Sequence, residues 1–182
     1  MAEDRSNDRS PCAACAAPTP GYDTVHYGNS EGGYRLLCTQ CFNAEVARAQ
    51  GLDDFENVRF DQIVMTDCAG ERHEFHFRTR LLGPMLALDA FELKGGNPAG
   101  YQFQILGDAE ADPMVLLAQL VERMRRSLAV KHLRQDKLGP QIAKQCVRAR
   151  IEWDDAHEGH QPLLVIDGQE VSWEEFGRML MA

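Results

Sequence analysis

The sequence predicts an α+β protein in which a cysteine-rich segment precedes an antiparallel sheet and its helices. Three observations lead to this prediction. Four of the six cysteines form two C-x2-C pairs within residues 12–41. Four segments between residues 59 and 106 alternate apolar and polar side chains, with the period of half-buried strands. The helical patterns follow these strands without the βαβ alternation that a parallel sheet requires.

The composition is that of an ordinary globular protein with an acidic balance. The 182 residues are 44% hydrophobic and 26% charged, and 19 basic against 28 acidic side chains give a net charge of −9. This charge disfavours binding of nucleic acid or an anionic membrane by the surface as a whole. The polar start MAEDRSNDRS and the absence of an apolar run near ~18 residues predict a cytoplasmic protein without membrane contact. In that compartment cysteines are metal ligands or free thiols more often than disulfides.

Shifts in composition divide the chain into four parts. A polar arm over residues 1–11 has nothing to bury and is predicted to be disordered. A cysteine-rich module over residues 12–51 follows, and then a sheet-and-helix domain over residues 55–134. Residues 141–182 predict a strand, a hairpin and a helix that we expect to pack on the preceding domain.

The cysteine-rich module has the spacing of a zinc site. Cys12 and Cys15 form one C-x2-C pair, and Cys38 and Cys41 form the other. Zinc binds four thiolates in a tetrahedron, and a C-x2-C turn presents two of them from one tight loop. Four thiolates leave no open coordination position, so the pattern predicts a structural ion and not a catalytic one.

The residues between the two pairs predict a hairpin that brings the pairs together. Segments 22–27 and 34–38 have β patterns and flank the loop GNSEGG. A short helix over Phe42–Gln50 follows, closed by Gly51. The positive end of that helix would stabilise the thiolate of Cys41.

This order of knuckle, hairpin and second knuckle resembles the treble-clef and zinc-ribbon class of zinc fingers, over residues 12–50. The resemblance implies one structural Zn²⁺ held by four ligands: Cys12, Cys15, Cys38 and Cys41. DNA-reading members of the class carry several basic residues on the helix, whereas the helix here, FNAEVARAQ, carries only Arg48.

Two other interpretations of the four cysteines stay open. They could be redox-active dithiols, although the βαβ context of thioredoxin-like chemistry is missing. They could also hold an iron–sulfur cluster, which accepts the same four ligands. The remaining cysteines, Cys68 and Cys146, are interpreted as buried or inert thiols.

The sheet-and-helix domain is predicted from four strand patterns and one helix pattern. Turn residues join the strands into an antiparallel meander: Arg59–Asp67, Glu71–Arg78, Pro84–Leu93 and Tyr101–Leu106. Asp112 and Pro113 begin a helix that extends to about His132. The apolar positions of this helix repeat at helical spacing: Met114, Leu117, Val121, Met124 and Leu128.

The C-terminal part is predicted to form a strand over Gln145–Trp153, a second strand over Leu163–Ile166 and a tight turn at the dipeptide DG. Ser172, with a glutamate three residues later, forms a capping box for a final helix over Trp173–Met181.

Charge is distributed unevenly between neighbouring segments. Residues 122–150 hold nine basic and two acidic side chains, whereas residues 151–182 hold one basic and eight acidic. The candidate contacts for nucleic acid or an acidic partner are these: Arg123, Arg125, Arg126, Lys131, Arg134 and Lys137. The alternative is that they favour a helix C-terminus and dock against the acidic C-terminal segment.

The sequence contains no phosphate-binding loop and no hydrolase, kinase or metalloprotease signature. We therefore expect a non-enzymatic zinc-binding adaptor or regulator that binds a protein partner or a second copy of itself. A nucleic-acid-associated regulator using residues 122–150 is the first alternative. The second is a small-ligand binder or enzyme that uses the sheet face, with His73 or His76 as its polar group.

Overall fold

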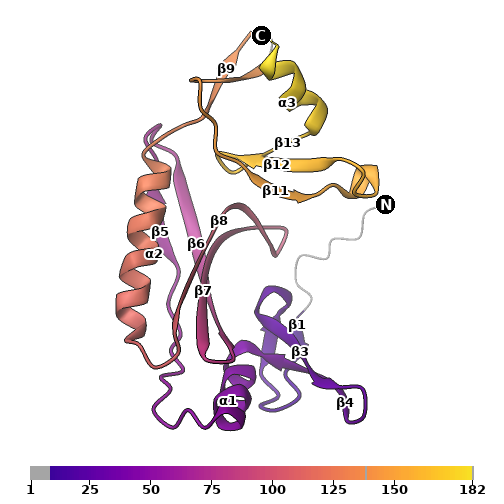
Figure 1. Cartoon of the computed structure of the whole chain (residues 1–182), viewed down its shortest axis with the longest axis vertical. Helices are drawn as coiled ribbons and strands as arrows, with labels where there is room; N and C mark the ends of the chain where they lie inside the picture. Colours follow the sequence, from indigo (N-terminus) through magenta and orange to yellow (C-terminus); the bar gives the residue numbers. More distant parts are fainter. Residues whose placement is uncertain (1–8, 138, 182) are drawn as a thin grey trace.

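A four-stranded antiparallel meander forms the centre of the computed structural model, which describes residues 9–137 and 139–181 (Figure 1). The strands pair in sequence order: β5 (Ile63–Thr66), β6 (Arg72–Leu82), β7 (Met85–Lys94) and β8 (Asn97–Asp108). The α+β class and the meander predicted from the sequence are confirmed.

Two tight turns set the register of the long strands. Leu82 pairs with Met85, and Lys94 pairs with Asn97, so that two residues close each hairpin. Gly95 and Gly96 have φ angles of 59° and 79°. Positive φ at both positions is what a hairpin turn of this twist requires, and it explains the GG dipeptide.

The cysteine-rich module lies at one end of the sheet and consists of two short ribbons and a helix. Its elements are β1 (Arg9–Pro11), β2 (Pro18–Pro20), η1 (Gly21–Asp23), β3 (Thr24–Asn29), β4 (Gly33–Cys38) and α1 (Thr39–Gln50). β3 and β4 form the predicted hairpin. Residues 9–11, expected to belong to a disordered arm, pair with β2, and residues 1–8 of that arm lie outside the described residues.

Helix α1 begins at Thr39, three residues earlier than predicted. Cys38 has extended backbone angles and its sulfur accepts a hydrogen bond from the N–H of Cys41, so it serves as the N-cap. Cysteine is not among the usual N-cap residues, and the sequence therefore gave no signal for this start. Gly51, with φ of 69°, ends the helix as predicted.

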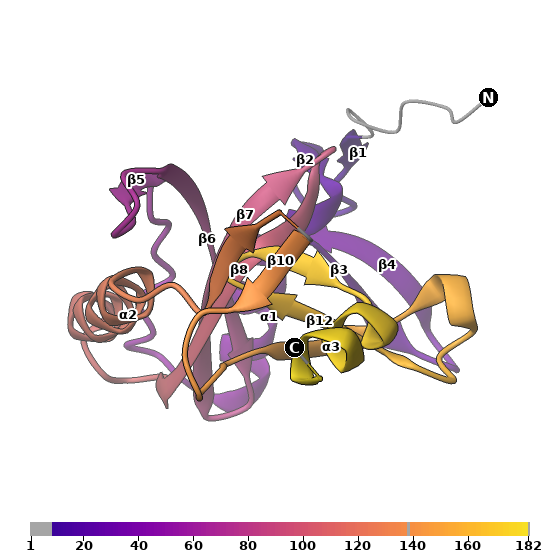
Figure 2. The same ribbon diagram turned by 90° about the horizontal axis from the view of Figure 1, so that it is seen from above.

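Helix α2 (Pro113–Leu128) covers one face of the sheet, as the view from above shows (Figure 2). The predicted apolar stripe was only partly right. Leu116 and Leu120 are buried with Met124, whereas Met114 is 59% exposed. The stripe is turned because Leu116 packs closely against Gly107 of β8, which has no side chain to fill that space.

The chain leaves α2 at Leu128 and not near His132. The backbone N–H groups of His132 and Leu133 donate to the carboxylate of Asp167, at 2.6 and 2.7 Å. These two bonds draw the chain out of the helix and fix it to the C-terminal module.

The C-terminal module has a small sheet covered by a helix. Its elements are β9 (Leu133–Asp136), β10 (Gly139–Ile142), β11 (Arg150–Trp153), η2 (Asp155–His157), β12 (Pro162–Ile166), β13 (Gln169–Val171) and α3 (Trp173–Leu180). The capping box on α3 is confirmed, because Ser172 and Glu175 exchange hydrogen bonds. The predicted strand over Gln145–Trp153 was too long, and the β9–β10 hairpin was not foreseen because its segments lack apolar alternation.

Candidate metal centre

Two separate backbone turns bring the four cysteines of the first module together. Cys12 and Cys15 lie in the turn between β1 and β2, where Ala16 has a φ of 59° and reverses the chain. Cys38 ends β4, and Cys41 lies in the first turn of α1. The N–H of Ala13 donates to the carbonyl of Leu36 at 2.8 Å, which fastens the first turn to β4.

The spacing of the four sulfurs fits a single tetrahedral metal ion. Their Sγ atoms lie 3.6–3.9 Å from one another. Four ligands about 2.3 Å from one ion stand at the corners of a tetrahedron with an edge of about 3.8 Å. The same distances are far too long for a disulfide, and all four cysteines are free. In a [4Fe–4S] cluster each cysteine binds a different iron, and in a [2Fe–2S] cluster each iron takes two of the cysteines, so either cluster requires a wider set of sulfurs than a single ion does.

Backbone donors and burial both act on these thiols. Burial raises the pKa of Cys12, but backbone N–H groups, including those of Cys15 and Cys38, outweigh it and lower the pKa to about 6. The N–H of Cys38 lies 3.2 Å from the Cys12 sulfur. Burial raises the pKa of Cys38 and of Cys41, and for Cys41 the neighbouring sulfurs raise it further. A bound cation would reverse that rise, because it stabilises every thiolate around it.

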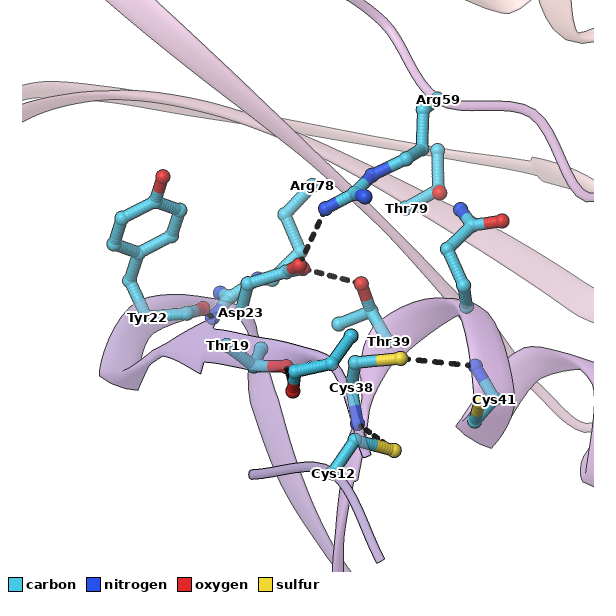
Figure 3. Close-up of polar contacts among 12 residues, drawn as sticks. Cys12, Thr19, Tyr22, Asp23, Cys38, Thr39, Cys41, Arg59, Arg78 and Thr79 are labelled. Carbon is cyan, nitrogen blue, oxygen red and sulfur yellow. Dashed lines mark hydrogen bonds and ion pairs between the residues drawn. The ribbon is translucent and has the colours of Figure 1, made fainter. Parts of the chain in front are cut away.

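A polar cluster beside the cysteines fastens the module to the sheet (Figure 3). The buried carboxylate of Asp23 accepts hydrogen bonds from Thr39, which follows Cys38, and from Arg59 at 2.9 Å. Arg78 of β6 donates to the carbonyl of Tyr22 at 2.7 Å. The segment before the hairpin, the start of α1 and the sheet are thus joined within one residue of Cys38.

Asn43 joins α1 to β6 on the side of the helix away from solvent. Its side chain is fully buried. The amide nitrogen donates to the carbonyl of Thr79 at 3.0 Å, and the amide oxygen accepts from the N–H of Leu81 at 2.8 Å. Phe42 and Val46 pack in the same cluster as Leu81. Helix α1 is therefore docked on the protein's own sheet, and its inner face is not available to a groove of DNA.

A lysine already pairs with a second group of potential metal ligands. Asp67, Glu71 and His73 lie close enough together to suggest a cation site. The ammonium of Lys131, however, lies 2.7 Å from Asp67 and 3.4 Å from Glu71. The lysine itself supplies the positive charge that a metal would bring, and the group is an internal ion-pair cluster.

This cluster ties three parts of the chain together. His73 bridges Asp67 and Glu92, at 3.2 and 2.9 Å from its two ring nitrogens. Burial raises the pKa of Asp67, but bonds from Lys131 and from backbone N–H groups outweigh it and hold the pKa below its usual range. Partial burial lowers the pKa of Lys131, and the bond to Asp67 outweighs this and raises it. Burial raises the pKa of the adjacent Tyr101 to about 12.

The predicted basic contacts come from several elements, and four of the six already have partners within the described chain. Arg125 and Arg126 both pair with Glu122 on α2. Lys131 belongs to the internal cluster, and Arg123 donates to the carbonyl of Gln104 at the edge of the sheet. The other two members are exposed around the β9–β10 hairpin: Arg134 and Lys137.

Sequence patterns missed the residues that hold the modules together, and they misplaced the lone cysteines. Asn43, Asp67 and Glu92 act through partners far away in the chain, so no local pattern could single them out. A buried-face position occupied by a polar residue, as Asn43 is on α1, was the one available signal. Cys68 and Cys146 are both exposed, so of the expectation that they are buried or inert, the burial is wrong.

Three family models match successive parts of the chain, and each describes a domain of unknown function. The matches cover residues 11–53 (DUF7685), 56–129 (DUF7686) and 132–182 (DUF7713). No curated protein and no solved structure matches the chain. Within the described residues, no helix is both long enough and apolar enough to span a membrane.

Proposed function

We propose that the chain is a non-enzymatic adaptor in which one structural Zn²⁺ holds the first module and the C-terminal module binds another protein. The observation that carries the partner role is a pair of apolar side chains on an edge strand. Ile151 and Trp153 of β11 are 72% and 67% exposed. Six free cysteines agree with a reducing, cytoplasmic location.

Zinc is favoured by the donor set and by the size of the module. Four thiolates at tetrahedral spacing match the ligands of structural zinc and fill every coordination position. The cysteine module buries few large side chains of its own, among them Leu37, Phe42 and Val46. A module of about 40 residues with so small a core commonly depends on a metal to fold.

The chemistry of β11 suggests an extended, basic partner segment. β11 pairs with β12 alone among the described strands, so its other edge has free backbone groups for an added strand. Ile151 and Trp153 are two positions apart on β11, so they lie on the same face of the strand and would contact every second side chain of the partner. Residues 151–182 hold eight acidic side chains against one basic, which favours Lys or Arg in that partner.

Native mass spectrometry of protein purified without added metal tests the zinc part. We expect the mass of one Zn²⁺ per chain, and a chelator should remove it and produce the broad charge states of an unfolded segment. Elemental analysis identifies the ion. A compact chain that never carries metal, or one that carries iron, would contradict the proposal.

Selection from a displayed library of random peptides tests the partner part. We expect enriched peptides with alternating apolar residues and several Lys or Arg, and their affinity should fall about tenfold or more on Trp153→Ser. Tyr34→Ser is the matched control, because Tyr34 is an equally exposed aromatic (68%) on the cysteine module. Enriched peptides without this pattern would refute the partner part of the proposal, and so would an equal loss of peptide affinity in both variants. A homodimer that buries β11 would refute it as well.

The alternative nucleic-acid role predicts a different result. Fluorescence anisotropy with duplex and single-stranded probes at low salt would then show binding that weakens when Arg125 and Arg126 are reversed to Glu. The pairing of both side chains with Glu122 argues against it, since part of their charge is already compensated.

A further inference from the structure

A groove of about 580 Å³ lies along the face of the central sheet opposite to α2. Figure 2 shows α2 against the other face of the sheet. Arg78 and Arg80 of β6 and Gln102 and Gln104 of β8 point to the face of the groove, because they alternate with the residues that pack under α2. Side chains from outside the sheet complete the groove: Arg123 of α2, and Ala149 and Arg150 at the start of β11.

The groove is basic in a protein that is acidic overall. Four arginines line it, and the carboxylates in contact with them are those of Asp89 and Glu152. Four positive charges against two negative charges leave a net of +2, whereas the whole chain carries −9. A positive concave site on an acidic protein attracts small anions without attracting long polyanions to the rest of its surface.

Asp89 holds the groove's donors in place before any ligand arrives. Its Oδ2 accepts from Arg78 at 3.0 and 3.1 Å and from Arg80 at 3.0 Å, and its Oδ1 accepts from Gln104 at 2.7 Å. The side chains of Arg78 and Arg80 are only 20% and 30% exposed. Fixed guanidinium groups of this kind lose little conformational entropy when they bind.

One donor of this set has no acceptor within the described chain. The Nε of Arg80 is buried and makes no hydrogen bond. A buried N–H without a partner is unusual in a folded protein. Arg78 and Arg80 also keep further N–H groups beyond those bonded to Asp89, so an oxyanion could be bound by several donors at once.

We propose that this groove binds a small phosphate-bearing molecule. Its volume is that of a small-molecule site, and the half-buried Pro98 with Phe91 gives it an apolar wall beside the arginines. Nucleic acid fits less well, since a long phosphate backbone needs a continuous basic track. The neighbouring Arg125 is paired with Glu122, and Lys131 with Asp67. The inference is independent of the adaptor role.

Isothermal titration calorimetry of the full, metal-loaded chain tests this proposal. The probes are inorganic pyrophosphate and ADP at low ionic strength, with adenosine as the uncharged control, and metal content is measured before and after. The variants are Arg80→Gln and Arg123→Gln. Arg125→Gln is the matched control, because it removes the same charge from the same helix outside the groove.

We expect one molecule of pyrophosphate or ADP per chain, with affinity lowered about tenfold to a hundredfold in each groove variant and unchanged in Arg125→Gln. Three results of this titration would overturn the proposal. They are no saturable binding up to about 5 mM, affinity that is equal in all variants, and adenosine binding as tight as that of ADP. Preferential binding of an oligonucleotide, with a salt dependence of several phosphates, would also overturn it and favour a nucleic-acid surface.

Discussion

Replacing Lys131 by methionine tests whether the internal ion-pair cluster holds the C-terminal module to the sheet. Lys131 follows α2 in sequence and reaches back to Asp67 in the turn between β5 and β6, at 2.7 Å. The side chain of Asp67 is fully buried. Methionine keeps most of the length and apolar surface of lysine, so the substitution removes the charge with little loss of packing.

The expected loss of stability depends on the hydrogen bonds that Asp67 keeps in the variant. Removing one partner of a buried ion pair costs about 3–5 kcal/mol, because an uncompensated charge is left behind. Here Asp67 still accepts from the N–H groups of Ala69 and Glu71 and contacts His73. The lysine side chain is also 20% exposed, so solvent screens part of the attraction. We expect a loss of about 2–3 kcal/mol, or a fall of about 1 M in the urea midpoint at pH 7.

The stabilisation by this ion pair should depend on pH in a direction that the two pKa shifts determine. The pKa of folded Asp67 lies below its ordinary 3.8, so its stabilising effect is complete above that value and is lost as the pH falls below it. The pKa of Lys131 lies above its ordinary 10.5, so its contribution is complete below that value. The difference in the free energy of unfolding between wild type and Lys131→Met should be constant from about pH 5 to pH 9, and it should become smaller below about pH 4.

Urea unfolding across this range, followed by circular dichroism, measures this difference. Lys137→Met is the control, since Lys137 is an exposed lysine close by in the chain and the same charge is removed. The prediction is wrong if Lys131→Met lowers the free energy of unfolding by less than about 0.5 kcal/mol at pH 7. It is also wrong if the loss is the same at pH 3, or if Lys137→Met causes an equal loss.

Three further predictions concern the cysteine module and its attachment. Cys38→Ser should lower bound metal from one ion per chain to none in native mass spectrometry, whereas Cys68→Ser, at an exposed lone cysteine, should leave it unchanged. Asn43→Ala leaves a buried carbonyl and a buried N–H of β6 without partners, and should lower the free energy of unfolding by about 2–4 kcal/mol in urea titrations. Acidification should release the metal as the thiolates become protonated, and a chromophoric chelator would follow this; metal retention down to pH 3 would contradict thiolate ligation.

Short-range signals in the sequence were enough for most of the elements. Period-two alternation found the four strands of the meander, turn residues marked their connections, and Ser172 marked a cap that the structure confirms. These features depend on residues within a few positions of one another. The two C-x2-C pairs belong to the same class, because each pair lies within one turn and the intervening hairpin is also local.

Features that depend on distant partners could not be predicted in this way. The apolar stripe of α2 is shared by two helical phases, and the phase in the structure places Leu116 against Gly107, a neighbour that lies in another element. The end of α2 is set by Asp167, 35 residues after His132, and the role of Lys131 is set by Asp67. The basic groove likewise gathers arginines from β6, α2 and β11, so its charge does not appear as a run in the sequence.

The position of the candidate metal centre predicts that an ion bound there would act beyond the cysteine module. A detachable finger would lose only its own fold on losing the ion. Here the first turn of α1 carries Cys41, and the next turn carries Asn43, whose side chain binds two backbone groups of β6. Asp23 likewise joins the residue after Cys38 to Arg59 at the approach to the sheet. If an ion binds the four thiolates, its loss should loosen these buried bonds, and the free energy of binding the proposed ion should then stabilise one side of the central sheet as well.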